Sequence, residues 1–322
     1  MVMNNLKKLK GLFVAVAGAI LIVGCGAQAH AQQEEDPKTS DRQISAIISA
    51  AELKELIDSN EPGLKILEPS KDAEVFAEGH LSAARFLHWV DDLTDPANKD
   101  YFSNPQPEDF AELMSRHGIQ NSDRIVIYDR LSSRLSTRLY WTLKVFGHDQ
   151  IQILDGGLEA WKAAGYELSN EAPVAAESSY EVSETRADLV AEMDYVTTQL
   201  AEGNTRLIDG RPADQFSGEK AGTIYHTQVE HPKRGHIPGA LNVFWKDNFN
   251  PDGTFKSVEE LRELYKNANV LPDNCVITYC NEGLHAAPPW FVLTQLLEYE
   301  NVKLYDNSMA EWAKSSNPVE EN

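Results

Sequence analysis

The chain has 322 residues, of which 25% are charged and 42% hydrophobic, with 19 glycines and 15 prolines. This ordinary globular composition excludes collagen-like, coiled-coil and wholly disordered proteins. Lys and Arg total 29 against 50 Asp and Glu, a formal net charge of -21. So acidic a chain repels phosphates, which argues against nonspecific nucleic-acid binding. The three cysteines, Cys25, Cys275 and Cys280, form no CxxC pair, which argues against a disulfide scaffold or a structural zinc site.

Residues 1–24 are typical of an export signal, with three lysines in residues 7–10 and an apolar run at 12–23 that is short for a membrane span. The run ends in a segment, IVGC, that resembles a lipobox. We therefore predict that Cys25 is lipidated and that the exported protein is a periplasmic, membrane-anchored lipoprotein. An ordinary signal-peptidase site at residues 29–31 (AHA) is the alternative.

Three motifs occur twice, in the same order, in the rest of the chain. GHLSAA at 79–84 parallels GHIPGA at 235–240, RIVIYD at 124–129 parallels CVITYC at 275–280, and LDGGLEAW at 154–161 parallels YDNSMAEW at 305–312. Such a repeat predicts two homologous tandem domains. We place them at residues 44–168 and 190–318, after a flexible tether at 25–43 and joined by a linker at 169–189.

Short β-branched runs alternate with amphipathic stretches in each unit. The first unit has expected strands at 64–67, 124–128 and 151–154 and helices at 51–57 and 135–145. The second has expected strands at 206–208, 276–279 and 302–305 and helices at 258–266 and 289–297. Near-continuous apolar strands separated by helices predict an α/β fold, with a buried parallel sheet flanked by helices in each domain.

The expected strand at 276–279 ends at Cys280, and the loop 281–285 separates this cysteine from a helix that begins near 286–289. Ligands and reactive groups of α/β folds gather at the carboxyl ends of parallel strands. Loop N–H groups and the positive end of the helix favour a thiolate, so we predict a lowered pKa and a nucleophilic Cys280. Cys275, at the start of the strand, is expected to be a small buried hydrophobe.

Taken together, these motifs resemble the two-domain rhodaneses, which are sulfurtransferases of the thiosulfate or 3-mercaptopyruvate type. The resemblance covers residues 44–318 and rests on GHIPGA at 235–240, DGR at 209–211, Cys280 with its loop, and residues 306–312. It implies that the second domain is catalytic and the first inactive. The sequence agrees, because Asp129 stands where Cys280 would be and Ser70 where Arg211 would be.

The resemblance implies a double displacement through a persulfide of Cys280. A small anionic donor gives up its outer sulfur to the cysteine, and a thiol, a dithiol protein or cyanide then removes it. Neither a metal nor an organic cofactor is required. The loop residues Asn281, Glu282, Gly283, Leu284 and His285 would contact the donor and the persulfide sulfur.

Arg211 is the first candidate to bind the anionic donor, since its planar fork suits sulfonate or carboxylate oxygens; an ion pair with Asp209 is the structural alternative. Lys233 and Arg234 are candidates for positive potential at the mouth of the site, or simply solvated charges. His285 is expected to face substrate or to brace the turn, and His236 to belong to the GHIPGA turn.

The loop differs from both rhodanese types at Asn281 and Glu282. A carboxylate there would repel thiosulfate unless Glu282 faces solvent or pairs with Lys233 or Arg234. Asn307 replaces an expected glycine, which predicts a left-handed backbone at this residue.

Three rival functions remain open. His226, His231 and His236 could bind a metal, but their spacing is poor for this. A thiolate phosphatase of related fold would need an arginine at position 286, which is Ala286 here. A non-catalytic sulfur carrier or a redox-sensing periplasmic binding module would use the same cysteine but would not turn over repeatedly.

Overall fold

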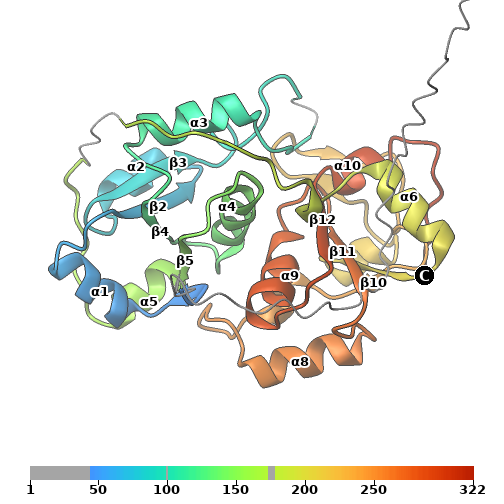
Figure 1. Cartoon of the computed structure of the whole chain (residues 1–322). Coiled ribbons are helices and arrows are strands. Elements are labelled where there is room, and N and C mark those ends of the chain that lie inside the picture. The colour runs from blue at the N-terminus through green and yellow to red at the C-terminus, as the bar shows by residue number, and fades with distance from the viewer. Residues whose placement is uncertain (1–43, 99–100, 173–177) are drawn as a thin grey trace, which may run out of the picture. The chain divides into compact units, whose positions relative to one another are not determined.

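The structure, a computed structural model, describes residues 44–98, 101–172 and 178–322. Its core is two five-stranded parallel sheets (Figure 1), with strand orders β1-β5-β4-β2-β3 and β10-β7-β11-β12-β6. When the five strands of each sheet are numbered 1 to 5 in chain order, the first sheet reads 1-5-4-2-3 and the second, read from its β6 edge, reads the same. The repeated architecture and the parallel α/β fold are therefore confirmed.

Each sheet is interleaved with helices. The first domain contains β1 (Ile47–Ile48), α1 (Ala50–Asp58), β2 (Leu64–Ser70), α2 (Ala73–Glu78), β3 (Ala84–His88), α3 (Pro107–Arg116), β4 (Arg124–Ile127), α4 (Arg134–Val145), β5 (Ile151–Leu154) and α5 (Gly157–Ala163).

The second domain begins with a single turn at Ala187–Leu189. It continues with β6 (Val190–Ala191), α6 (Met193–Glu202), β7 (Thr205–Asp209), α7 (Ala213–Phe216), β8 (Thr223–Ile224), β9 (Val229–Glu230), β10 (Leu241–Asn242), a turn at Trp245–Asn248, α8 (Val258–Asn267), β11 (Cys275–Tyr279), α9 (Ala287–Phe291), a π-helix (Val292–Leu296), β12 (Val302–Tyr305) and α10 (Ser308–Trp312). The antiparallel pair β8–β9 stands outside the sheet.

All six predicted strands form. The sequence missed β1, β3, β6 and β10 of the two sheets. β1, β6 and β10 have two residues each, too few to show a pattern, and β3 (ARFLH) is not a continuous apolar run. The expected helix at 289–297 is instead α9 followed by a π-helix, in which the N–H of Leu297 reaches back five residues to the carbonyl of Val292.

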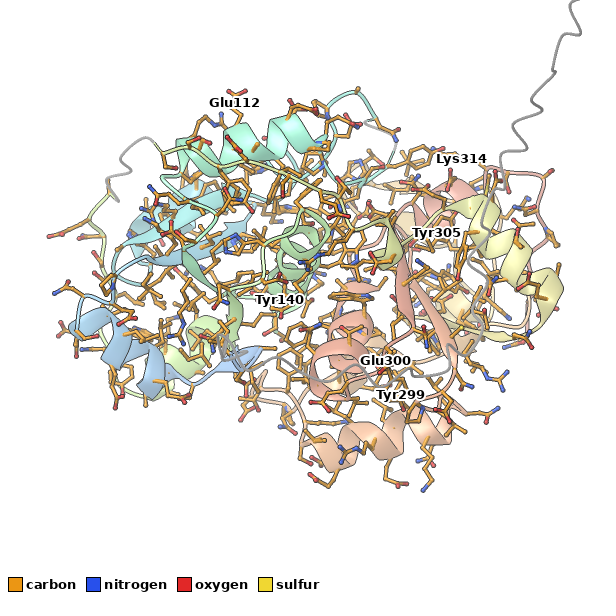
Figure 2. All side chains as sticks on the ribbon, viewed as in Figure 1. Glu112, Tyr140, Tyr299, Glu300, Tyr305 and Lys314 are labelled. Carbon is orange, nitrogen blue, oxygen red and sulfur yellow. The ribbon has the colours of Figure 1, made fainter. Side chains whose placement is uncertain are left out.

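Apolar side chains cover both faces of each sheet, as expected for parallel strands. One core cluster joins the two domains. In it Tyr140 of α4, labelled in Figure 2, packs edge-on against Phe291 of α9 with ring centres 4.8 Å apart. The Tyr140 hydroxyl donates to Gln295 at 2.8 Å. Two further clusters bury the opposite faces, beneath α1 and α5 in the first domain and beneath α6 and α10 in the second. The two domains therefore pack against each other through α4 and α9, the helices on the facing sides of the two sheets.

The predicted signal and tether, with Cys25, lie outside the described residues, as does part of the predicted linker. Among the described residues of that linker, Tyr180 is buried against Phe110 and His148. No helix in the described ranges combines the length and the apolar character needed to cross a membrane.

Candidate active site

Cys280 follows β11, the central strand of the second sheet, and is a free thiol with only 1% of its surface exposed. The loop turns back at Gly283, whose φ of +80° is left-handed, and the backbone N–H of His285 donates to the Cys280 Sγ at 3.2 Å. The helix that follows starts at Ala287, as predicted. Cys275, at the start of β11, is half-buried, whereas the sequence predicted a small buried hydrophobe.

The pKa of Cys280 is raised to about 11, chiefly because burial disfavours the thiolate. Backbone N–H groups of Glu282, His285 and Ala286 oppose this and favour the thiolate, whereas the Glu282 charge adds to the rise. The predicted lowering is therefore wrong in sign, because the desolvation of the sulfur exceeds the effect of the loop N–H groups. The resting group at neutral pH is the thiol.

Ser308, which the sequence did not single out, fixes the base of the loop. Its hydroxyl accepts from the N–H groups of Cys280 (3.0 Å) and Gly283 (3.2 Å) and donates to the carbonyl of Tyr305 (2.7 Å). These contacts hold Ser308 at a φ of +49°, while Asn307 has an ordinary φ of -70°. The left-handed residue is therefore Ser308, and the prediction for Asn307 is wrong.

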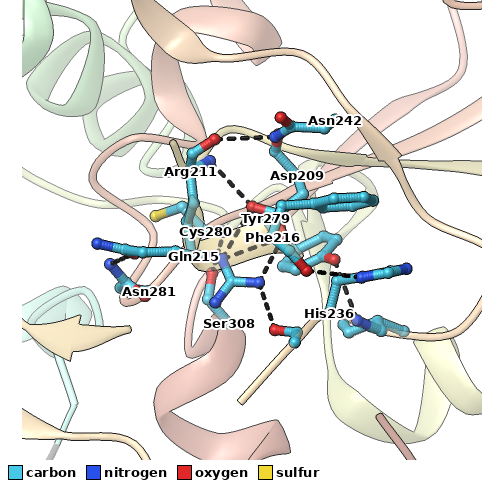
Figure 3. A network of polar contacts seen from close by, with 12 residues as sticks. Asp209, Arg211, Gln215, Phe216, His236, Asn242, Tyr279, Cys280, Asn281 and Ser308 are labelled. Atoms are coloured by element: carbon cyan, nitrogen blue, oxygen red, sulfur yellow. Dashed lines mark hydrogen bonds and ion pairs between the residues drawn. The ribbon is translucent and has the colours of Figure 1, made fainter. Parts of the chain in front are cut away.

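Arg211 and Asp209 form the ion pair that the sequence offered as the structural alternative (Figure 3). The Arg211 Nε lies 3.0 Å from both carboxylate oxygens, one Nη lies 2.6 Å from Oδ2, and the same Nη donates to the carbonyl of Gly235 at 2.8 Å. Both side chains are buried. Most donors of this guanidinium are therefore committed within the protein.

His236 is structural, as the sequence expected. Its ring stacks on Phe216 at 3.8 Å, and Nδ1 lies 2.8 Å from the Phe216 carbonyl. The next residue, Ile237, donates its N–H to the Tyr279 hydroxyl at 3.2 Å. The GHIPGA turn is thus hydrogen-bonded to Tyr279 of β11, the strand that precedes Cys280.

The uncharged loop side chains point in different directions. Asn281 contacts His231 and Gln215, each at 3.0 Å. Leu284 packs among apolar residues of the first domain, Trp89, Phe102 and Leu135. Hydrogen bonds therefore fix the side chain of Asn281, and apolar packing fixes that of Leu284.

The ring of His285 stacks on Trp245 at 5.2 Å, and its Nε2 lies 3.1 Å from an Nη of Arg134. Burial, followed by the charges of Arg134 and Lys246, lowers the pKa of His285 to about 3. The ring is therefore neutral at pH 7 and accepts from the guanidinium. Of the two expected roles, these contacts support bracing.

Glu282 occupies none of the expected positions, because the residue is 1% exposed and its side chain turns toward the β8–β9 hairpin. Its Oε1 accepts from the N–H of Tyr225 at 2.9 Å, and Oε2 lies 2.6 Å from Nδ1 of His226. It neither faces solvent nor pairs with Lys233 or Arg234. A hairpin too short to predict supplies its partners.

Replacing Glu282 by glutamine is expected to lower the pKa of Cys280, since the glutamate charge is one cause of its rise. Alkylation of Cys280 by iodoacetamide should become several-fold faster at pH 7–8, with the midpoint of its pH profile moved to lower pH. The exposed Glu263→Gln on α8 is the matched control. An unchanged or upward-shifted midpoint in Glu282→Gln would contradict this electrostatic coupling.

Lys233 and Arg234 were candidates either for positive potential at the mouth of the site or for solvated charges. The Lys233 ammonium donates to the carbonyls of Ser315 and Asn317, both at 2.6 Å, so its placement at the mouth is wrong. Arg234 is exposed. The exposure of Arg234 fits the alternative of a solvated charge.

The first domain repeats this architecture around Asp129, which follows β4 as Cys280 follows β11. Its buried carboxylate accepts backbone N–H groups from the loop residues Leu131 (2.7 Å) and Ser133 (3.0 Å) and from Leu135 (2.8 Å) and Ser136 (2.8 Å) in the first turn of α4. The loop that follows the central strand is thus built to surround an anion.

A guanidinium is also kept in the first domain, from a different residue. The register places Ser70 where the second domain has Arg211. Arg130 substitutes for it: its Nε lies 2.6 Å from the buried Glu68, and it donates to the carbonyl of Gly79 at 2.6 Å.

The three histidines weighed as metal ligands have separate partners: His226 contacts Glu282, His231 contacts Asn281 and His236 contacts Phe216. No cluster of potential metal ligands occurs within the part of the chain that the structure describes. A cavity of about 510 Å³ lies beside β1 and α1, and Cys280 does not line it.

Comparison with known proteins identifies this architecture. A family model described as a rhodanese-like domain matches residues 49–164 and 192–315. A thiosulfate sulfurtransferase of Corynebacterium glutamicum is 37% identical over 272 residues, which are 83% of this chain and 87% of the relative. The sulfur carrier protein TtuD of Thermus thermophilus is 34% identical over 255 residues, or 78% and 88% of the two chains.

Among solved structures, the 3-mercaptopyruvate sulfotransferase SseA of Escherichia coli superposes with a TM-score of 0.71 at 29% identity, covering 82% of this chain and 99% of that one. The fold and site define a tandem α/β protein with a buried cysteine in a loop whose backbone N–H groups face the sulfur. The chain belongs to the rhodanese family, with two rhodanese-like domains.

Proposed function

We propose that the protein is a sulfurtransferase that carries a sulfane sulfur on Cys280, taking it from thiosulfate or a related small anion and giving it to a thiol, a dithiol protein or cyanide. The transferase class rests on relatives named as sulfurtransferases. The persulfide, the donor and the acceptor are proposals that rest on the site.

Both half-reactions balance without a cofactor. In the first, the sulfur of Cys280 attacks the outer sulfur of thiosulfate, the S–S bond of thiosulfate breaks, sulfite leaves with the bonding pair, and the thiol proton remains on the new persulfide. In the second, cyanide takes the outer sulfur as thiocyanate and the thiol is restored. The resting group is a thiol with a raised pKa. Its proton must therefore pass from the attacking sulfur to the transferred outer sulfur as the new S–S bond forms.

The observation that carries this proposal is the loop geometry shared by the two domains. In the first domain four N–H groups surround the Asp129 carboxylate, and in the second three loop N–H groups favour a negative charge on Cys280. A persulfide anion at Cys280 would meet the same kind of donors. This arrangement needs no group beyond the chain itself.

We infer that the first domain is inactive, and that Asp129→Cys in a Cys280→Ser background stays inactive. The exchange would leave the N–H groups around position 129 without the carboxylate that they bind, which destabilises the loop. The measurement is thiocyanate formation from thiosulfate and cyanide. Activity above that of Cys280→Ser alone would show that the first loop can also catalyse transfer.

The second candidate function is a stoichiometric sulfur carrier, which the relative named sulfur carrier protein favours. The phosphatase reading has no such support, because Ala286 is buried and offers no guanidinium to a phosphate. Export and lipid anchoring at Cys25 stay predictions, to be tested by mass spectrometry of the membrane fraction.

Wild-type protein treated with thiosulfate, and separately with 3-mercaptopyruvate, tests the proposal. The peptide that contains Cys280 should gain the mass of one sulfur atom, and cyanide should then release thiocyanate over repeated cycles. One equivalent of thiocyanate without turnover would favour the carrier. The absence of any sulfur on Cys280 from either donor would contradict both functions.

A further inference from the structure

Arg134, the first residue of α4, reaches from the inactive domain to the Cys280 loop. One Nη lies 3.1 Å from Nε2 of His285, and the guanidinium stands 5.2 Å from the ring centre of Tyr225 and 5.8 Å from that of Trp245. Two aromatic rings and an imidazole of the catalytic domain therefore hold an arginine of the other domain. Because this packing already orders the guanidinium, it would lose little conformational freedom on binding an anion.

Among the residues that the structure describes, this guanidinium has no carboxylate counter-ion. Three other arginines near the two loops each have one: Arg130 pairs with Glu68, Arg138 with Asp306 and Arg211 with Asp209. Within the described ranges no carboxylate forms an ion pair with Arg134, and its Nε is buried without a hydrogen-bond partner. In a chain of net charge -21, such a cation is conspicuous and can accept an anion from outside.

His285 links this cation to the reacting sulfur. Its backbone N–H donates to Cys280 Sγ at 3.2 Å, and its ring meets Arg134. Since the ring is neutral, it leaves the guanidinium charge uncompensated. Lys246, whose ammonium lies 5.5 Å from the ring centre of Trp245, is a second positive charge that acts on the His285 ring.

We propose that Arg134 binds the anionic end of the sulfur donor, so that the inactive domain supplies the charge that selects the substrate of Cys280. The donors that fit are small molecules whose leaving group carries a sulfonate or a carboxylate, which a guanidinium binds through two parallel hydrogen bonds. The role expected of Arg211 passes to Arg134, since Asp209 and Gly235 occupy most donors of Arg211. This inference rests on the proposed sulfurtransferase function.

The test compares Arg134→Gln and Arg134→Lys with wild type in the cyanide assay. The donors are thiosulfate, 3-mercaptopyruvate and 2-hydroxyethyl persulfide, whose leaving group carries no acid. Loss of a charge-assisted contact should raise KM for the two acids about tenfold or more, with kcat nearly unchanged. The uncharged-tail donor should be unaffected, and Arg134→Lys should be intermediate. Arg262→Gln, on the exposed face of α8, removes the same charge elsewhere and should match wild type.

Equal loss with all three donors, or an unchanged KM for thiosulfate in Arg134→Gln, would overturn the proposal. Thermal melting shows whether each variant folds, and Arg134→Lys keeps the test open if the glutamine variant does not. Sulfite binding measured by calorimetry is independent of turnover. If wild type binds sulfite but transfers no sulfur, the proposed function fails. The binding role of Arg134 is then decided by calorimetry alone: weaker sulfite binding in Arg134→Gln supports it, and unchanged binding contradicts it.

Discussion

Replacing Cys280 by serine is expected to abolish sulfur transfer and leave the fold intact. A serine hydroxyl is a far weaker nucleophile toward sulfur and cannot hold a persulfide, so thiocyanate formation should fall by about four orders of magnitude or more, to the uncatalysed level. The hydroxyl is close in size to the thiol and can accept the N–H of His285 that the sulfur accepts now. The melting temperature should therefore change little.

Two measurements make this result specific to Cys280. Mass spectrometry of the variant after treatment with thiosulfate should find no added sulfur anywhere in the chain. A circular dichroism spectrum and melt equal to wild type would show that lost activity is not lost structure. Residual turnover in a correctly folded Cys280→Ser protein would place the sulfur on another group and contradict the assignment.

The central strands of both sheets could be predicted from sequence because they are buried on both faces and therefore read as continuous apolar runs, as in β4 and β11. Strands at the sheet edges could not. The strands β1, β6 and β10 have two residues each, and only their pairing with longer neighbouring strands identifies them. The edge strand β3 has five residues, but Arg85 and His88 interrupt its apolar run. The repeated motifs gave the domain order, since they fall at the same strands in both units.

The candidate site divides in a similar way. Cys280, Asp209 and Arg211 are local features of strand ends, and the sequence could name them. Ser308 lies 28 residues from Cys280, and Arg134 lies 151 residues from His285. Packing between elements, and between domains, brings these groups to the loop. The sign of the Cys280 pKa shift was missed for the same reason, because burial is a tertiary property.

Gly283→Ala is expected to inactivate the protein and to destabilise it, because the loop has no room for a side chain there. A Cβ would lie 2.6 Å from Oδ1 and 2.7 Å from the carbonyl oxygen of Asp306, and 2.8 Å from an Nη of Arg138. Arg138 and Asp306 form an ion pair that joins the two domains, and Arg138 is only 1% exposed. Relief of the clash must therefore move the loop, which displaces the N–H groups that face Cys280.

Gly239→Ala separates the clash from the backbone strain. Gly239 has a φ of +74°, close to the +80° of Gly283, but a Cβ there meets nothing within 4 Å. It should cost only the left-handed strain, about 1–2 kcal/mol. Gly283→Ala should add an overpacking cost of about 1–3 kcal/mol and reduce kcat/KM at least about a hundredfold. Urea unfolding and the cyanide assay measure both effects. If the two variants behave alike, backbone strain alone accounts for the loss, and the contact of Gly283 with the Arg138–Asp306 pair does not position the catalytic loop.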